Sequence, residues 1–247
     1  VSNRFSELER ICQMVIDLNA YDSKRFREPD YKRRLDAFRE LNEKEYLNLS
    51  TIEWIPVLYT CIFFINDEED QSLRSSAGYT FTRYIDALNA KTEDEATLYI
   101  KQLKELIIPT VRSGLKKKNE LVRGEYVRVL DHIVKHVKYY HEFDDLKILL
   151  KYDEEDDESD FFEDIIHLQT FKRQRSLRAV AKLAPKISSN NIAHYILPII
   201  EHYAFWTDEK YRNVANETVI TYKRLTQFIS WNQYRAILTR YVNIMNT

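Results

Sequence analysis

The chain has 247 residues, a net charge of −2, three glycines, five prolines and two cysteines. This charge excludes a uniformly basic nucleic-acid-binding protein, so any such affinity would come from local patches. Scarce glycine, without Asn-Gly or Asp-Gly pairs, argues against β-hairpins and predicts an all-α chain. Cys12 and Cys61 lie in apolar helical patterns, without the spacing of a disulfide framework or metal site, which fits a reducing intracellular compartment.

No stretch approaches the ~18 consecutive apolar residues of a membrane span, and no signal-peptide pattern is present. We therefore expect a soluble protein that does not act at a membrane. The chain begins at Val1 and stops at Thr247 inside an amphipathic pattern, so we expect it to be a fragment of a longer chain.

Apolar residues recur at helical spacing along almost the entire chain. The predicted helices span about residues 4–19, 29–43, 51–65, 71–88, 92–113, 119–138, 144–150, 160–186 with a bend near 169–173, 191–205, 208–229 and 231–245. Four helix starts carry a capping-box pattern: Ser50 with Glu53, Thr92 with Glu95, Asp160 with Glu163, and Ser230 with Gln233. Pro29 suits a first helical position. The helix at 51–65 is apolar nearly all round, which predicts burial between neighbours.

Three of the first helices contain a proline in a similar setting, at Pro56, Pro109 and Pro198. The helix that follows each carries an arginine with a small or apolar residue three positions later: Arg74 with Ala77, Arg123 with Tyr126, and Arg212 with Ala215, while Arg178 with Ala181 supplies a fourth case. This pattern resembles the HEAT repeat, a helix pair of roughly 40–47 residues. We therefore predict a single HEAT-type α-solenoid over residues 1–247, with about ten to eleven helices in antiparallel pairs.

The one break in composition is the acidic run from Asp153 to Asp160. We interpret it as a solvated, disordered loop inserted in one repeat at 152–160. Two alternatives remain. The run could bind a divalent cation, although it lacks the glycine and spacing of an EF-hand, or it could mimic nucleic acid and cover a basic surface.

Catalysis has little support in the sequence. His132 and His136 lie one helical turn apart, as zinc ligands often do, but Ile133 stands where a zinc protease has its glutamate, so a structural or surface role is favoured. Glycine-rich phosphate loops and nucleophile elbows are missing. We expect no enzyme activity, no cofactor, no metal and no small-molecule substrate.

Two clusters of cations are candidates for binding RNA phosphates or an acidic partner. The first contains Arg112, Lys116, Lys117, Lys118, Arg123, Arg128, Lys135 and Lys138, and the second contains Lys172, Arg173, Arg175, Arg178 and Lys182. A solvated helix face is the alternative for each. If both clusters lie on second helices of adjacent repeats, their fields add along one side of the array.

The central stretch resembles the DRIM family through Asp160-Phe161-Phe162-Glu163, His167-x-Gln169 and Arg173-x-Arg175-x-Leu177-Arg178. Two outer stretches agree: Glu28-Pro29-Asp30-Tyr31 with Arg34-Leu35-x-Ala37-Phe38, and Trp231-x-x-Tyr234 with Arg240-Tyr241. Members are very large α-solenoids of the small-subunit processome, associated with the U-three small nucleolar RNA. The resemblance implies a non-catalytic nucleolar scaffold that supports pre-rRNA processing, with other processome proteins and pre-rRNA or small nucleolar RNA as partners.

Two alternatives stay open. The chain could be a purely protein-binding HEAT adaptor, of the kind used in nuclear transport or phosphatase scaffolding, whose grooves accept partner helices or acidic peptides. A helical enzyme would depend on His132 and His136.

Overall fold

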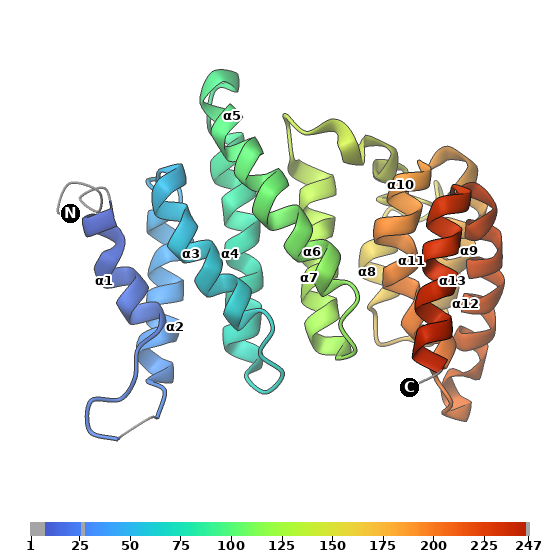
Figure 1. The fold of residues 1–247 in the computed structure, drawn as a ribbon, viewed down its shortest axis with the longest axis horizontal. Coiled ribbons are helices and arrows are strands. Elements are labelled where there is room, and N and C mark those ends of the chain that lie inside the picture. The colour runs from blue at the N-terminus through green and yellow to red at the C-terminus, as the bar shows by residue number, and fades with distance from the viewer. Residues whose placement is uncertain (1–7, 26–27, 246–247) are drawn as a thin grey trace. The chain divides into compact units, whose positions relative to one another are not determined.

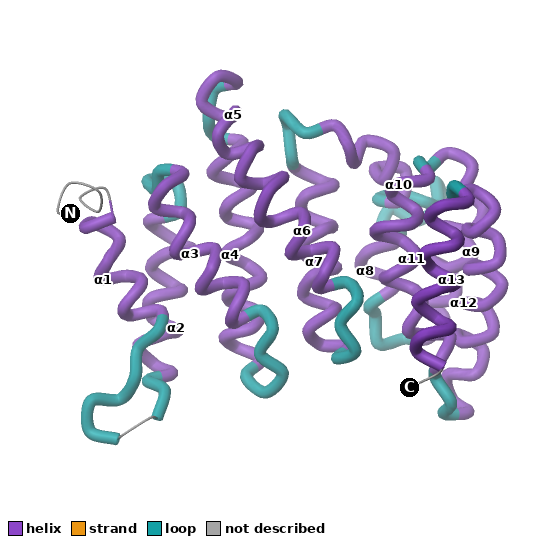
Figure 2. Tube along the Cα trace, viewed as in Figure 1, coloured by secondary structure: helices purple, strands orange, loops and turns teal. Residues whose placement is uncertain are grey.

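The computed structural model describes residues 8–25 and 28–245, and in these ranges every regular element is a helix (Figures 1 and 2). The only pairing of the β type that they contain is an isolated bridge between Tyr21 and Pro29. The predicted all-α class is confirmed. The chain forms two compact units, Val1–Tyr140 and His141–Thr247, which we call unit 1 and unit 2. Whether they continue one another as a single array stays a prediction.

Unit 1 consists of paired helices in two layers (Figure 1). The helices are α1 (Glu9–Leu18), α2 (Tyr31–Glu40), α3 (Thr51–Phe64), α4 (Gln71–Asn89), α5 (Glu93–Gln102), α6 (Ile108–Gly114) and α7 (Glu120–His136). One layer holds α1, α3, α5 and α6, and the other holds α2, α4 and α7. Successive helices pair α1 with α2, α3 with α4, and α6 with α7, as expected for HEAT-type repeats.

Local sequence signals explain most helix starts in unit 1. The capping boxes of Ser50 with Glu53 and of Thr92 with Glu95 are both formed, which confirms those predictions. Pro29 does not take the first helical position, because Asp30 caps α2 by accepting a hydrogen bond from the backbone N–H of Arg33.

Two π-helical turns in the structure lie directly before a proline. A π-helical turn, Leu103–Ile107, joins α5 to α6 just before Pro109, which lacks the N–H of a regular helical ladder. In unit 2, a similar turn at Ile192–Ile196 precedes Pro198.

Unit 2 begins with a 3₁₀ segment, His141–Leu149. Its helices are α8 (Phe161–Ile165), α9 (Thr170–Leu183), α10 (Ser189–Asn191), α11 (Leu197–Ile200), α12 (Arg212–Leu225) and α13 (Trp231–Met245). Helix α9 packs between α8 and α12. The central stretch is interrupted, but at residues 166–169, earlier than the bend predicted near 169–173, which lies mostly in the first turn of α9.

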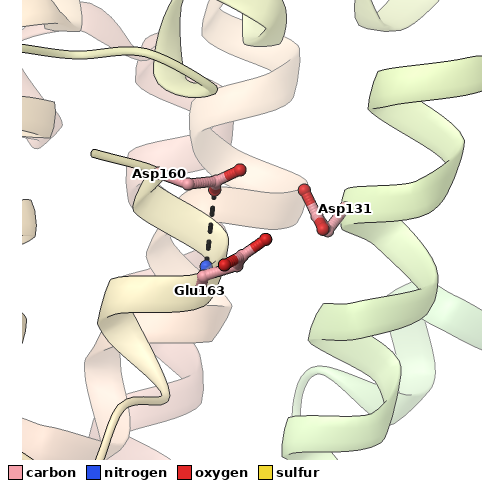
Figure 3. Close-up of side chains that lie close together, drawn as sticks. All are labelled: Asp131, Asp160 and Glu163. Atoms are coloured by element: carbon pink, nitrogen blue, oxygen red, sulfur yellow. Dashed lines mark hydrogen bonds between the residues drawn. The ribbon is translucent and has the colours of Figure 1, made fainter. Parts of the chain in front are cut away.

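The Asp160 carboxylate caps α8, accepting hydrogen bonds from the backbone N–H groups of Phe162 at 2.8 Å and Glu163 at 3.4 Å. Figure 3 shows the bond to Glu163. The predicted start of this helix is therefore confirmed. At the last helix, the side chains of Ser230 and Gln233 bond each other's backbone N–H groups, as their spacing predicts.

The core of unit 1 includes one face of α3, with Trp54, Leu58 and Cys61 completely buried. The opposite face of α3 is exposed, so the predicted burial between neighbours holds for one face of this helix and is wrong for the other. Among the described residues, no helix is long and apolar enough to cross a membrane.

Candidate nucleic-acid interface

Four buried arginines share one position and one role. Arg34, Arg74, Arg123 and Arg173 each lie four residues after the N-cap of a helix, which is Asp30, Asp70, Asn119 and Gln169 in turn. Each donates a hydrogen bond to a carbonyl oxygen in the segment before that helix: Arg34 to Ala20 at 2.8 Å, Arg74 to Asp67 at 2.8 Å, Arg123 to Lys117 at 2.8 Å, and Arg173 to His167 at 2.5 Å. These arginines therefore fasten each connection to the helix that follows it.

The sequence predicts RNA contact for two of these arginines, Arg123 and Arg173. Arg123 is 3% exposed and Arg173 is 5% exposed, and Arg173 also lies against the rings of Tyr203 and Trp206. Such guanidinium groups cannot reach a phosphate without unfolding their surroundings, so we remove both from the candidate surface. The repeat arginine of α9 is Arg173, whereas Arg178, assigned to that role from the sequence, is exposed.

Arg212 keeps the same spacing without the same burial. It lies four residues after Asp208, which caps the 3₁₀ turn Glu209–Tyr211, but its side chain is exposed. The predicted repeat arginine in this pair is thus present in sequence and does not fasten a connection as the buried four do.

The first cluster has its most accessible cations in the turn between α6 and α7. The side chains of Lys116, Lys117 and Lys118 are all exposed. Their backbone is fixed by Arg123, whose Nη1 bonds the carbonyl oxygens of Lys117 at 2.8 Å and Lys118 at 3.2 Å. A buried arginine thus holds a turn that presents three adjacent ammonium groups. We call residues 116–118 the basic turn.

The other cations of the first cluster are engaged within unit 1. Arg128 is exposed but pairs with Glu125 at 2.8 Å, and Lys135 pairs with Asp131 at 2.8 Å. Lys138 donates to the carbonyl oxygen of Asn89 at 3.2 Å. The guanidinium of Arg128 is exposed even though the Glu125 carboxylate that it contacts is largely buried. Arg128 therefore remains accessible to a phosphate, with a competing carboxylate beside it.

In the second cluster, Arg175 is the centre of a network within unit 2. Its guanidinium donates to the hydroxyl of Tyr152 at 2.7 Å, to Asp164 at 3.1 Å and to the Asp156 carboxylate. Partial burial opposes the charged form, but the bonds to Asp156 and Asp164 outweigh it and raise the pKa of Arg175. The same contact with Arg175 lowers the pKa of Asp156. Arg175 thus binds three groups of unit 2, and we remove it from the candidate RNA-binding surface.

The remaining cations of this cluster differ in accessibility. Lys172 lies 3.7 Å from Asp164 and is partly buried. Arg178 is exposed and pairs with Glu217 of α12 at 2.8 Å, while Lys182 is exposed. On α9, therefore, Arg178 and Lys182 are the side chains that a phosphate could reach.

The acidic run is folded where it meets Arg175. Ser159 is completely buried, and its hydroxyl oxygen accepts from the backbone N–H of Asp153 at 3.0 Å while its O–H donates to the Asp153 carbonyl. Together with the Asp156–Arg175 pair, this loop closure overturns the expectation of a disordered segment. Of the two alternatives, an acidic segment that covers a basic surface agrees better with these contacts than a divalent-cation site, because Asp156 pairs with Arg175.

The two histidines considered as metal ligands have other neighbours. The Nε2 of His132 lies 3.1 Å from Asp86 of α4, and its ring is 4.4 Å from that of His136. Burial lowers the pKa of His132, although Asp86 opposes this shift. A partly buried imidazole that contacts one carboxylate between two helices suits a packing role.

Residues 1–119 match the family described as U3 small nucleolar RNA-associated protein 20, N-terminal. Over its entire length the chain is 42% identical to part of U3 small nucleolar RNA-associated protein 20 from Saccharomyces cerevisiae. The chain belongs to this family. It is also 33% identical, over 94% of its length, to the protein of the same name from Schizosaccharomyces pombe. It spans only 10% and 9% of these two relatives. The resemblance to the DRIM family is confirmed.

Proposed function

We propose that the chain is a section of a non-catalytic scaffold in small-subunit ribosome assembly. In this role it supports pre-rRNA processing in the nucleolus by holding segments of other processome proteins and RNA. Two findings support the proposal: 42% identity along the whole chain to a protein named for its association with U3 small nucleolar RNA, and layers of paired helices that offer long faces. A single array over both units would extend those faces.

The observation that carries direct RNA contact is the basic turn. Lys116, Lys117 and Lys118 present three adjacent exposed ammonium groups on a backbone that Arg123 holds in place. Adjacent cations on a fixed turn bind phosphates with little loss of backbone freedom, and each phosphate that they neutralise releases counterions. Arg128, Arg178 and Lys182 are secondary candidates, since each is exposed.

The test is the binding of a labelled small-subunit pre-rRNA fragment to the 247-residue chain over a series of salt concentrations. We expect the triple variant K116E, K117E, K118E to bind more weakly. With about three contacts removed, the slope of log affinity against log salt should become shallower by about 2, at roughly 0.7 per contact for single strands.

The matched control is K32E, K101E, K223E, which changes three exposed lysines elsewhere and gives the same net charge. It should keep most of the native salt slope, because its charges lie far apart in the sequence and form no cluster. If the two triple variants bind RNA equally, the basic turn is not the contact. If native and variant chains all show the same weak, salt-insensitive binding, the chain is a protein-binding section of the scaffold.

A further inference from the structure

Helix α3 carries an apolar stripe on its exposed face. Ile52, Ile55, Tyr59 and Phe63 follow one another at spacings of three, four and four residues, and they are between 43% and 70% exposed. This spacing places all four on one side of the helix, along about 16 Å at 1.5 Å per residue. We call these four residues the α3 stripe.

The exposure of the stripe is built into the packing of unit 1. The other face of α3 is buried in the core of unit 1 and carries Trp54, Leu58 and Cys61. The helix contacts α1, α4 and α5. Single exposed apolar residues are common on protein surfaces, but a row of four over three turns is not. Nothing within the described part of unit 1 covers the α3 stripe.

Negative charge lies at one end of the stripe. The chain leaves α3 through residues 66–70, where Glu68 and Glu69 have exposed side chains that form no ion pair with the described residues. This turn continues directly from the helix, since the N–H of Asn66 bonds the carbonyl oxygen of Phe63 at 3.3 Å. The helix C-terminus adds partial negative charge there. At the other end, Glu53 is buried and bound to Arg10 at 2.8 Å.

We propose that the α3 stripe is a docking site for an amphipathic helix of a partner protein. That helix has apolar residues at spacings of three and four, with lysine or arginine residues at the end that meets Glu68 and Glu69. Apolar side chains on the partner would pack between those of the stripe, and its cations would set the direction in which it lies. This surface is separate from the basic turn and does not depend on RNA binding.

A designed peptide tests this chemistry directly. The probe is an 18-residue labelled helix with leucines at spacings of three, four and four and a pair of lysines at one end. A second peptide replaces the lysines with glutamates, and a third replaces the leucines with glutamines. We expect the 247-residue chain to bind the lysine peptide at least tenfold more tightly than either alternative, measured by fluorescence anisotropy.

Variants of the chain assign that binding to the stripe. The double variant Y59S, F63S changes two exposed side chains and should reduce affinity for the lysine peptide at least tenfold, with unchanged circular dichroism. Leu121→Ser is the matched control, because Leu121 is exposed on α7 in the other layer, and it should bind normally. The double variant E68K, E69K should reverse the preference between the lysine and glutamate peptides.

Three results would overturn the proposal. Equal binding of the lysine and glutamate peptides would remove the charge argument, and unchanged binding by Y59S, F63S would remove the stripe. If sedimentation shows that the native chain self-associates and Y59S, F63S does not, the occupant is a second copy of this chain. None of these results bears on the salt dependence of RNA binding by the basic turn.

Discussion

The two turns that connect the layers of unit 1 at residues 66–70 and 115–119 are built alike but carry opposite charge. Each follows a helix of the first layer and leads into α4 or α7. In each, a buried arginine at the fourth position after the N-cap bonds a backbone carbonyl at 2.8 Å, Arg74 to Asp67 and Arg123 to Lys117. The turn at 66–70 nevertheless exposes two carboxylates, Glu68 and Glu69, whereas the turn at 115–119 exposes the three lysines of the basic turn.

This contrast separates what the fold requires from what it leaves open. The arginine recognises carbonyl oxygens, which every residue supplies, so the side chains of the turn are under no constraint from it. A repeat can therefore change the charge that it presents to a partner without altering its framework. In unit 1, the same device leaves cations exposed at one turn and carboxylates at another, a few tens of residues apart in the chain.

The largest expected effect on stability comes from replacing the buried arginine that the two turns share. Arg74→Met and Arg123→Met each remove a buried guanidinium and leave partly buried carbonyl oxygens without their charged donor, and each should lower the free energy of unfolding by about 3 kcal/mol in urea denaturation. Arg39→Met, on an exposed side chain of α2 that pairs with exposed Asp36, is the control and should change it by less than about 0.5 kcal/mol. The prediction is contradicted if Arg123→Met behaves like Arg39→Met, or if only one of the two buried arginines matters.

The sequence was sufficient to predict the helices, since their apolar spacing and caps are local signals. It also indicated arginine as the repeat residue, and it identified Arg74 and Arg123 correctly. The spacing of Arg178 to Ala181 points to the wrong arginine in α9, because the buried arginines are defined by their distance from the N-cap. Counting four residues from Gln169 would have found Arg173.

Contacts between distant parts of the sequence were harder to predict. The Tyr152–Asp164–Arg175–Asp156 network depends on the acidic run folding back on α9, and the composition of that run by itself favours disorder. The exposed face of α3 was missed for a related reason. A helix that is apolar all round is normally buried, and only the arrangement of its neighbours shows that one face of α3 has no cover.

A smaller effect on stability is expected from the two glycines that lie near the basic turn, Gly114 and Gly124. A Cβ on Gly114, two residues before Lys116, would lie 2.1 Å from the Tyr126 ring of α7. Gly114→Ala should therefore push α6 from α7 and lower the free energy of unfolding by about 2 kcal/mol. At Gly124, a Cβ would meet nothing within 4 Å, so Gly124→Ala in the interior of α7 should raise it by about 0.5–1 kcal/mol. Thermal unfolding of both variants distinguishes close packing from helix propensity, and destabilisation by both would contradict this account.

The smallest expected effect on stability comes from exchanging the charges of the two turns. The variants K116E, K117E, K118E and E68K, E69K should each change the free energy of unfolding by no more than about 0.5 kcal/mol, because exposed charges contribute little and Arg74 and Arg123 bond only the backbone. Urea denaturation at moderate salt measures this. A loss above about 1.5 kcal/mol in either variant would mean that the charges help to hold the turn. If both variants are as stable as the native chain, any loss of RNA or peptide binding in them reports the surface itself, because the framework beneath it is intact.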